Sequence, residues 1–83
     1  MKSYTIVGVI SKVTHVPNAA NYHRTVKQRI SVVTRSGDIY SGVKPNGLIG
    51  ATIGKIVQFL ADIRETKKDG EWIFVRARDG YVL

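Results

Sequence analysis

The sequence contains no cysteine, which excludes a disulfide framework, a thiolate metal site and a cysteine nucleophile. Its longest apolar run, residues 6–10, is too short for the apolar segment of a signal peptide or for a membrane span. We therefore expect a cytoplasmic chain without a targeting segment and without a membrane partner. Acidic residues are also scarce, since six Asp and Glu stand against 13 Lys and Arg. The formal net charge of +7 excludes an acidic buffer protein.

The 83 residues leave room for one small domain, residues 1–83, with a single hydrophobic core. A hydrophobic fraction of 43% and a charged fraction of 23% are typical of a globular chain. Residues 1–37 contain six basic and no acidic residues, whereas residues 38–83 contain seven basic and six acidic residues. This asymmetry favours a polyanionic partner, nucleic acid before an anionic membrane, over a chance clustering of solubilising lysines.

Hydrophobicity alternates with a period of two along most of the chain, which predicts β-strands. Gly8 in the first strand predicts a bend or bulge that lets one strand serve two sheets. Three glycines in residues 45–54 favour a loop, and Asp79-Gly80 predicts a turn before a short C-terminal end. No segment has a helical period. We expect an all-β, five-stranded closed barrel with little or no helix, its strands at residues 4–16, 23–35, 39–44, 55–66 and 71–78.

The predicted outward strand faces combine cations with aromatic rings. Cations pair with phosphates and rings stack on unpaired bases, so such a face suits a single-stranded nucleic acid. Duplex DNA would need a helix or ribbon shaped to a groove, and none is predicted. The outward residues are Lys27 and Arg29 on the second strand, Tyr40 and Lys44 on the third, and Trp72, Phe74, Arg76 and Arg78 on the fifth.

Alternatives remain open for these faces. Trp72 and Phe74 either stack on bases, pack beneath residues 81–83, or form a dimer interface. Lys27 and Arg29 could belong to an ordinary solvated strand face. No carboxylate lies in their half of the chain to pair with them across strands, however, and this favours phosphate contacts.

Residues that could carry catalysis or metal binding are few. His15 and His23 lie eight residues apart without a third ligand in reach, so we expect no metal site. The glycine-rich residues 47–54 lack the Gly-Lys-Ser/Thr sequence of a nucleotide-binding loop. Three of the six carboxylates adjoin a glycine, which is typical of turns. We expect a protein that is not an enzyme and needs no cofactor.

Three segments resemble the oligonucleotide/oligosaccharide-binding (OB) fold of the single-stranded nucleic-acid-binding type. They are YTIVGVI at 4–10, ISVVTRSGD at 30–38 and GKIVQFLADI at 54–63. The resemblance spans nearly the whole chain, which departs from the pattern by lacking a helix between strands three and four. It implies a ligand that crosses strands two and three between the loops at 17–23 and 66–70. This type includes small phage-encoded dimeric proteins that are also almost entirely β. The resemblance to them implies a role in DNA replication or recombination, a possible phage origin and a possible homodimer.

We therefore predict that the chain binds single-stranded nucleic acid, DNA rather than RNA. The rival interpretation is an assembly module that uses Trp72 and Phe74 as a dimer or partner interface. A third is a binder of duplex or ribosomal RNA that reads shape. The expected phosphate contacts are Arg24, Lys27, Arg29, Arg35, Lys44, Lys67 and Lys68, and the expected stacking residues are Tyr22, Tyr40, and Trp72 or Phe74.

Overall fold

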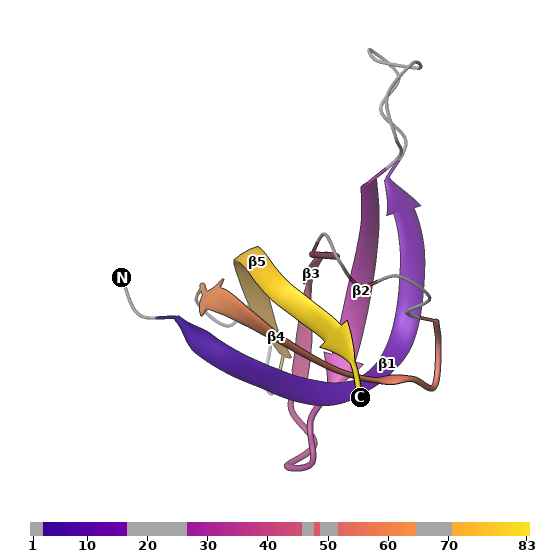
Figure 1. The fold of residues 1–83 in the computed structure, drawn as a ribbon, viewed down its shortest axis with the longest axis horizontal. Coiled ribbons are helices and arrows are strands. Elements are labelled where there is room, and N and C mark those ends of the chain that lie inside the picture. The colour runs from indigo at the N-terminus through magenta and orange to yellow at the C-terminus, as the bar shows by residue number, and fades with distance from the viewer. Residues whose placement is uncertain (1–2, 17–26, 46–47, 49–51, 65–70) are drawn as a thin grey trace.

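Five strands form a closed barrel in the order β1-β2-β3-β5-β4 (Figure 1). The structure, a computed structural model, describes residues 3–16, 27–45, 48, 52–64 and 71–83, without the side chains of residues 15, 16 and 27. No described residue lies in a helix. The predicted all-β, five-stranded barrel is thus confirmed. The strands are β1 (Tyr4–Val16), β2 (Lys27–Val33), β3 (Ile39–Val43), β4 (Ile56–Ile63) and β5 (Glu71–Val82).

Strand β1 takes part in two pairings and bends between them. Residues 4–9 pair with β4, and residues 9–16 pair with β2. A Cβ on Gly8 would lie 2.5 Å from both Val32 Cγ1 and the Val33 carbonyl oxygen, so only glycine fits where β1 turns onto β2. The bend predicted at Gly8 is confirmed, and Figure 1 shows the long curved strand that results.

The barrel closes through a short parallel pairing of β3 with β5, from Ile39 opposite Glu71 to Ser41 opposite Ile73. Parallel neighbours need a long connection, and the segment containing β4 provides it. Gly42 is the β3 residue that follows this pairing, and a Cβ there would lie 2.5 Å from the Phe74 carbonyl oxygen. The pairing that closes the barrel therefore requires a glycine at position 42.

Strand β5 continues to Val82, so the turn predicted at residues 79–80 is wrong. Over residues 75–78 and again over 78–81, β5 advances three residues while β4 advances two. Arg76 and Asp79 have φ angles of 53°, in the left-handed region that accommodates an extra residue. The Asp-Gly pair at 79–80 therefore belongs to a bulge.

The interior contains aliphatic side chains around two phenylalanines. The rings of Phe59 and Phe74 lie 4.9 Å apart, and Phe74 is 1% exposed. The prediction that Phe74 can stack on a base is wrong, because its side chain points into the barrel. Burying such a side chain stabilises the fold by about 1.5–3 kcal/mol. The core comprises Ile6, Ile10, Ile30, Val32, Leu48, Val57, Phe59, Ala61 and Phe74.

The side chains of β3 point opposite to the prediction. Ile39 and Val43 are exposed, whereas Gly42 is buried and Tyr40 packs against the core. The pairing with β2 explains this, because Tyr40 lies opposite the buried Val32. Gly42 leaves room for the Phe74 ring, so the branched residues of β3 face outward.

No helix in the described part of the chain is long and apolar enough to cross a membrane.

Candidate nucleic-acid interface

Cross-strand pairing gathers polar and basic side chains on the outer surface of β1, β2 and β3. Ser31 lies opposite both Lys12 and Ser41 in its two neighbouring strands, and Arg29 lies opposite Thr14 and Val43. Directly opposite residues share one face of a sheet, and the intervening Ile30 and Val32 are buried. We call this surface the β2–β3 face and define it as Lys12, Thr14, Arg29, Ser31, Ser41 and Val43.

Small hydroxyl side chains lie at the centre of the β2–β3 face. Ser31 Oγ and Ser41 Oγ are 2.9 Å apart and share a hydrogen bond across the strands. Ser11 Oγ donates to the Ser31 carbonyl oxygen at 3.3 Å, next to the bulge that separates Ile10 from Lys12. Small side chains let an extended ligand approach the backbone, and hydroxyl groups can donate to phosphate oxygens.

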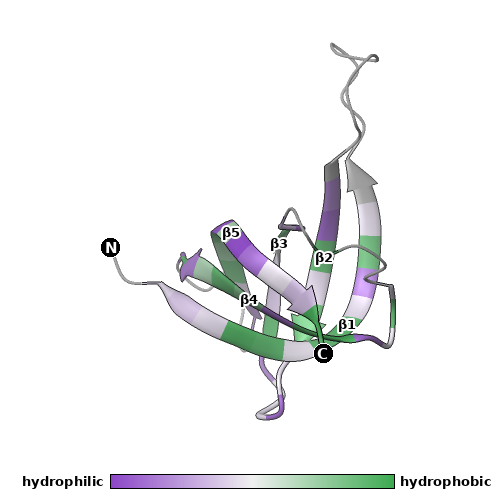
Figure 2. Ribbon diagram, viewed as in Figure 1, coloured by the Kyte–Doolittle hydropathy of each residue, from purple (hydrophilic) through white to green (hydrophobic). Residues whose placement is uncertain are grey.

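The cations of the β2–β3 face carry no ion pair to any described carboxylate. Both ion pairs among the described residues involve Asp62 instead. Lys12 is exposed and Arg29 is half-buried, so both charges remain available to an anionic ligand. Figure 2 shows the hydrophilic start of β2 beside the end of β1. Lys44, also expected here, lies nearby, because its backbone N–H donates to the Gln28 carbonyl oxygen at 2.8 Å.

Tyr40 and Trp72 form a stacked aromatic pair where β3 and β5 begin. Their ring centroids are 6.3 Å apart with an interplanar angle of 15°, and both residues are half-buried. The parallel register places them directly opposite each other, next to Ile39 and Ser41. Burial, with smaller contributions from Asp38 and Tyr4, raises the pKa of Tyr40 above its ordinary value of 10.0. The phenol therefore stays neutral near pH 7 and does not repel a phosphate.

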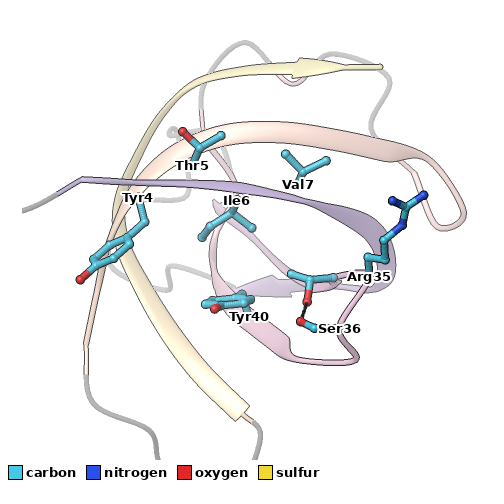
Figure 3. A pocket seen from close by; sticks show the side chains of 8 residues that line it. Tyr4, Thr5, Ile6, Val7, Arg35, Ser36 and Tyr40 are labelled. Atoms are coloured by element: carbon cyan, nitrogen blue, oxygen red, sulfur yellow. Dashed lines mark hydrogen bonds between the residues drawn. The ribbon is translucent and has the colours of Figure 1, made fainter.

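An open hollow of about 520 Å³ lies between the first half of β1 and the turn after β2 (Figure 3). Arg35 lines this hollow, so the structure separates it from Arg29 and the β2–β3 face. Tyr4, which is 50% exposed, lines it as well. The full lining is Tyr4, Thr5, Ile6, Val7, Thr34, Arg35, Ser36 and Tyr40.

The two arginines of β5 are held by a buried carboxylate away from the β2–β3 face. Asp62 is 7% exposed, and its Oδ2 accepts from Arg76 Nη1 at 3.0 Å. Its Oδ1 lies 3.8 Å from Arg78 Nη1 and accepts a hydrogen bond of 3.4 Å from Ser3 Oγ. Arg78 also donates to Ser3 Oγ and to the Arg76 carbonyl oxygen. The cluster ties β5 to β4 and to the start of β1.

The structure thus brings the backbone of Lys44 beside β2, next to the Arg29–Val43 pair, and leaves Tyr40 and Trp72 at the neighbouring end of the barrel. The backbone of Lys27 lies in β2 opposite Val16, and nothing is described of its side chain. Sequence patterns missed Lys12 and Ser41, because only the strand register shows that they share a face with Arg29. Ser31 lies on the face of Arg29 by alternation along β2, but it was not predicted as a site residue. The predicted contacts that fall outside the described residues are Tyr22, Arg24, Lys67 and Lys68.

Within the described ranges, no group of three or more His, Cys, Asp or Glu side chains could hold a metal ion. Comparison with known proteins adds no relative: no family model matches the chain, and no curated protein or solved structure matches it significantly.

Proposed function

We propose that this chain is an OB-fold protein that binds single-stranded nucleic acid, DNA in preference to RNA, across its β2–β3 face. The observation that carries the proposal is the strip of cations, none paired with a described carboxylate, interleaved with serine hydroxyls on the outside of a closed five-stranded barrel. OB barrels are five-stranded Greek-key barrels that bind oligonucleotides over strands two and three. The strand order supports this assignment, because β1 pairs with both β2 and β4 and the pairing of β3 with β5 closes the barrel.

In the proposed complex, Lys12 and Arg29 neutralise phosphates. Within the Ser31–Ser41 pair, the hydroxyl that accepts the shared hydrogen bond keeps its own proton and donates it to a phosphate oxygen. The Tyr40–Trp72 pair lies on the inner side of β3, so only bases that reach around the end of the barrel meet these half-buried rings. Each base that stacks there contributes about 1–3 kcal/mol. Contacts from both flanking loops complete the site in this proposal. Tyr22, Lys67 and Lys68 would make these contacts together with the neighbouring Arg24, and all four lie outside the described residues.

The surface itself favours a single strand over a duplex. No described element projects from the barrel as a helix that could enter a major groove. Stacking on Tyr40 or Trp72 requires bases that are free of a partner strand. The rival assembly module loses one of its two proposed anchor residues, because Phe74 is 1% exposed and unavailable to a partner, while Trp72 is half-buried.

A titration of fluorescently labelled oligo(dT) tests the proposal, with Trp72 emission followed in parallel. Arg29→Glu replaces a phosphate contact by repulsion, so we expect affinity to fall roughly ten- to hundredfold. Lys55→Glu is the matched control, because it makes the same change in net charge at an exposed position beside β4. Equal losses in the two variants would show that the β2–β3 face is not the site. Absence of binding at low salt would overturn the proposed function itself.

A further inference from the structure

The first half of β1 has one edge without a neighbouring strand. The pairing of β1 with β2 ends at Val9 opposite Val33, and residues 4–8 pair only with β4. Beyond Val33 the chain curls into a turn, in which Thr34 N–H donates to the Asp38 carbonyl and Gly37 N–H donates to the Thr34 carbonyl, both at 2.9 Å. The hollow opens between this turn and β1.

The backbone groups that face the hollow follow from the hydrogen bonds of Ile10. Its N–H donates to the Lys55 carbonyl at 2.9 Å, and its carbonyl accepts from Gly54 N–H at 2.8 Å, so both groups of Ile10 point toward the β4 side. Successive residues of a strand point their backbone groups to opposite edges. Counting back along β1, the N–H and C=O groups of Thr5 and Val7 point into the hollow.

These four backbone groups have no partner among the described residues. They lie two residues apart, the spacing at which an added strand forms its ladder. Edge strands are usually protected by a charged side chain, a proline or a bulge. Residues 4–8, Tyr-Thr-Ile-Val-Gly, include no charged residue and no proline, and the bulge of β1 lies beyond Ile10.

The side chains around the hollow indicate what kind of chain fits this edge. Figure 3 shows Tyr4 near one end of the β1 segment and Arg35 near the other. Arg35 is exposed and forms no ion pair with a described carboxylate, so it suits an acidic side chain. Tyr4 and Tyr40 offer apolar contact, and the volume of about 520 Å³ lies within the range of ligand pockets.

We propose that this hollow binds an extended peptide segment of a partner protein, which adds to the Thr5–Val7 edge of β1 as an extra strand and places an acidic side chain on Arg35. The backbone ladder provides affinity, and Arg35 selects the charge of the peptide. A second copy of the chain fits less well, because two copies of net charge +7 repel each other. A nucleic acid has no alternating N–H and C=O groups to match the edge. This site lies apart from the β2–β3 face and does not depend on the proposed function.

Amide hydrogen exchange of the full chain, followed by NMR, tests the proposal. The probe is a capped pentapeptide of alternating Val and Thr with a central Asp. At saturating peptide we expect exchange of the Thr5 and Val7 amides to slow about tenfold or more, because they become ladder donors. The Ile6 amide, which already faces β4, is the internal control and should change little. Absence of protection at Thr5 and Val7 would overturn the proposal.

A charge exchange tests the selectivity. Arg35→Glu should weaken binding of the Asp peptide roughly five- to tenfold and favour a Lys peptide of otherwise identical sequence. Arg35 lies in an exposed turn, and an unchanged melting temperature would verify the fold. Equal affinity of the natural protein for the Asp and Lys peptides would overturn the acidic preference. Protection of Thr5 and Val7 by raised protein concentration alone, or by oligo(dT) and not by the peptide, would replace the partner with a second copy or with nucleic acid.

Discussion

Glycine determines how closely the strands of this barrel approach one another. At Gly8 and Gly42, a Cβ would lie 2.5 Å from atoms of a neighbouring strand. Such contacts are closer than any methyl group tolerates, so larger residues at these positions must push strands apart. Both glycines lie on the inner side of the wall, where a shifted strand also disturbs the core.

We predict that Gly8→Ala destabilises the protein by about 1–3 kcal/mol, because the added methyl group overlaps Val32 and the Val33 backbone. The midpoint and slope of urea unfolding measure the loss. Thr5→Ala is the control on the same strand, since Thr5 is exposed and its substitution should cost less than about 0.5–1 kcal/mol. If both variants unfold at the same urea concentration, β1 does not depend on close approach at Gly8.

Hydrophobicity alone predicts the wrong inward-facing side chains on β3. Ile39 and Val43 are the larger apolar residues, and an alternation rule buries them in place of Tyr40 and Gly42. The observed choice depends on the Phe74 ring, which occupies the space that Gly42 leaves. Phe74 lies 32 residues away in sequence, so the fit between the two cannot be read from either segment.

At the scale of single elements, β5 is held in place by a carboxylate that serves two arginines. The two bulges interrupt regular pairing with β4, and Arg76 and Asp79 adopt φ angles of 53°. Backbone in this region costs about 1 kcal/mol or more for residues with a Cβ. The Asp62 cluster fastens this irregular stretch to β4 and to Ser3.

A double-mutant cycle on Asp62→Ala and Arg76→Ala should give a coupling free energy of about 0.5–1 kcal/mol. The value is small because the Arg76 side chain is 62% exposed and its ion pair is screened by water. The backbone cost at φ 53° is common to arginine and alanine, so it cancels in the cycle. The same cycle with Arg64→Ala, an exposed cation without an ion pair to a described residue, should give a coupling near zero. Equal couplings in the two cycles would contradict a specific pair.

Strand positions were predictable wherever one face of a strand packs on the core. The predicted range of 4–16 matches β1, and the other strands were found with ends shifted by a few residues. The end of β5 was missed because each bulge inserts a residue and interrupts the period of two. The Asp62 cluster was missed for a related reason, since an acidic residue on a predicted outer face gives no sign of burial.

At the scale of the whole molecule, net charge is the main determinant of how this protein is expected to associate with polyanions. The net charge is +7, and among the described acids only Asp62 is engaged in ion pairs. Most described cations therefore contribute to a positive field that attracts polyanions and speeds their association. Such a field predicts strong dependence on salt.

We expect the logarithm of oligo(dT) affinity to fall linearly with the logarithm of salt concentration, with a slope of roughly −3.5 for five phosphate contacts. Arg29→Glu should make the slope shallower by about 0.7, which corresponds to one lost contact. Fluorescence titrations over a series from about 50 to 200 mM salt measure both slopes. A slope near zero for the natural sequence would contradict binding through phosphates.

Charge asymmetry along the chain was enough to predict a polyanionic partner, but not the surface that meets it. Lys12 and Arg29 are 17 positions apart and become neighbours only through the register of β1 with β2. Arg35 is nearer to Arg29 in sequence, yet the turn after β2 carries it to the hollow. Which cations act together depends on pairing and turns, and neither can be derived from counting charges.

The parallel closure of β3 on β5 also affects how the chain reaches its native state. Strands β3 and β5 are far apart in sequence and must come together for the barrel to close. The first half of β1 likewise stays unpaired until β4 has formed. Barrels built from such distant pairings fold in milliseconds to seconds, much more slowly than helical bundles. Until β5 arrives, β3 and β4 each expose an edge that another nascent chain can join. The interval before the last strand docks is therefore the period in which this chain is most exposed to misassembly.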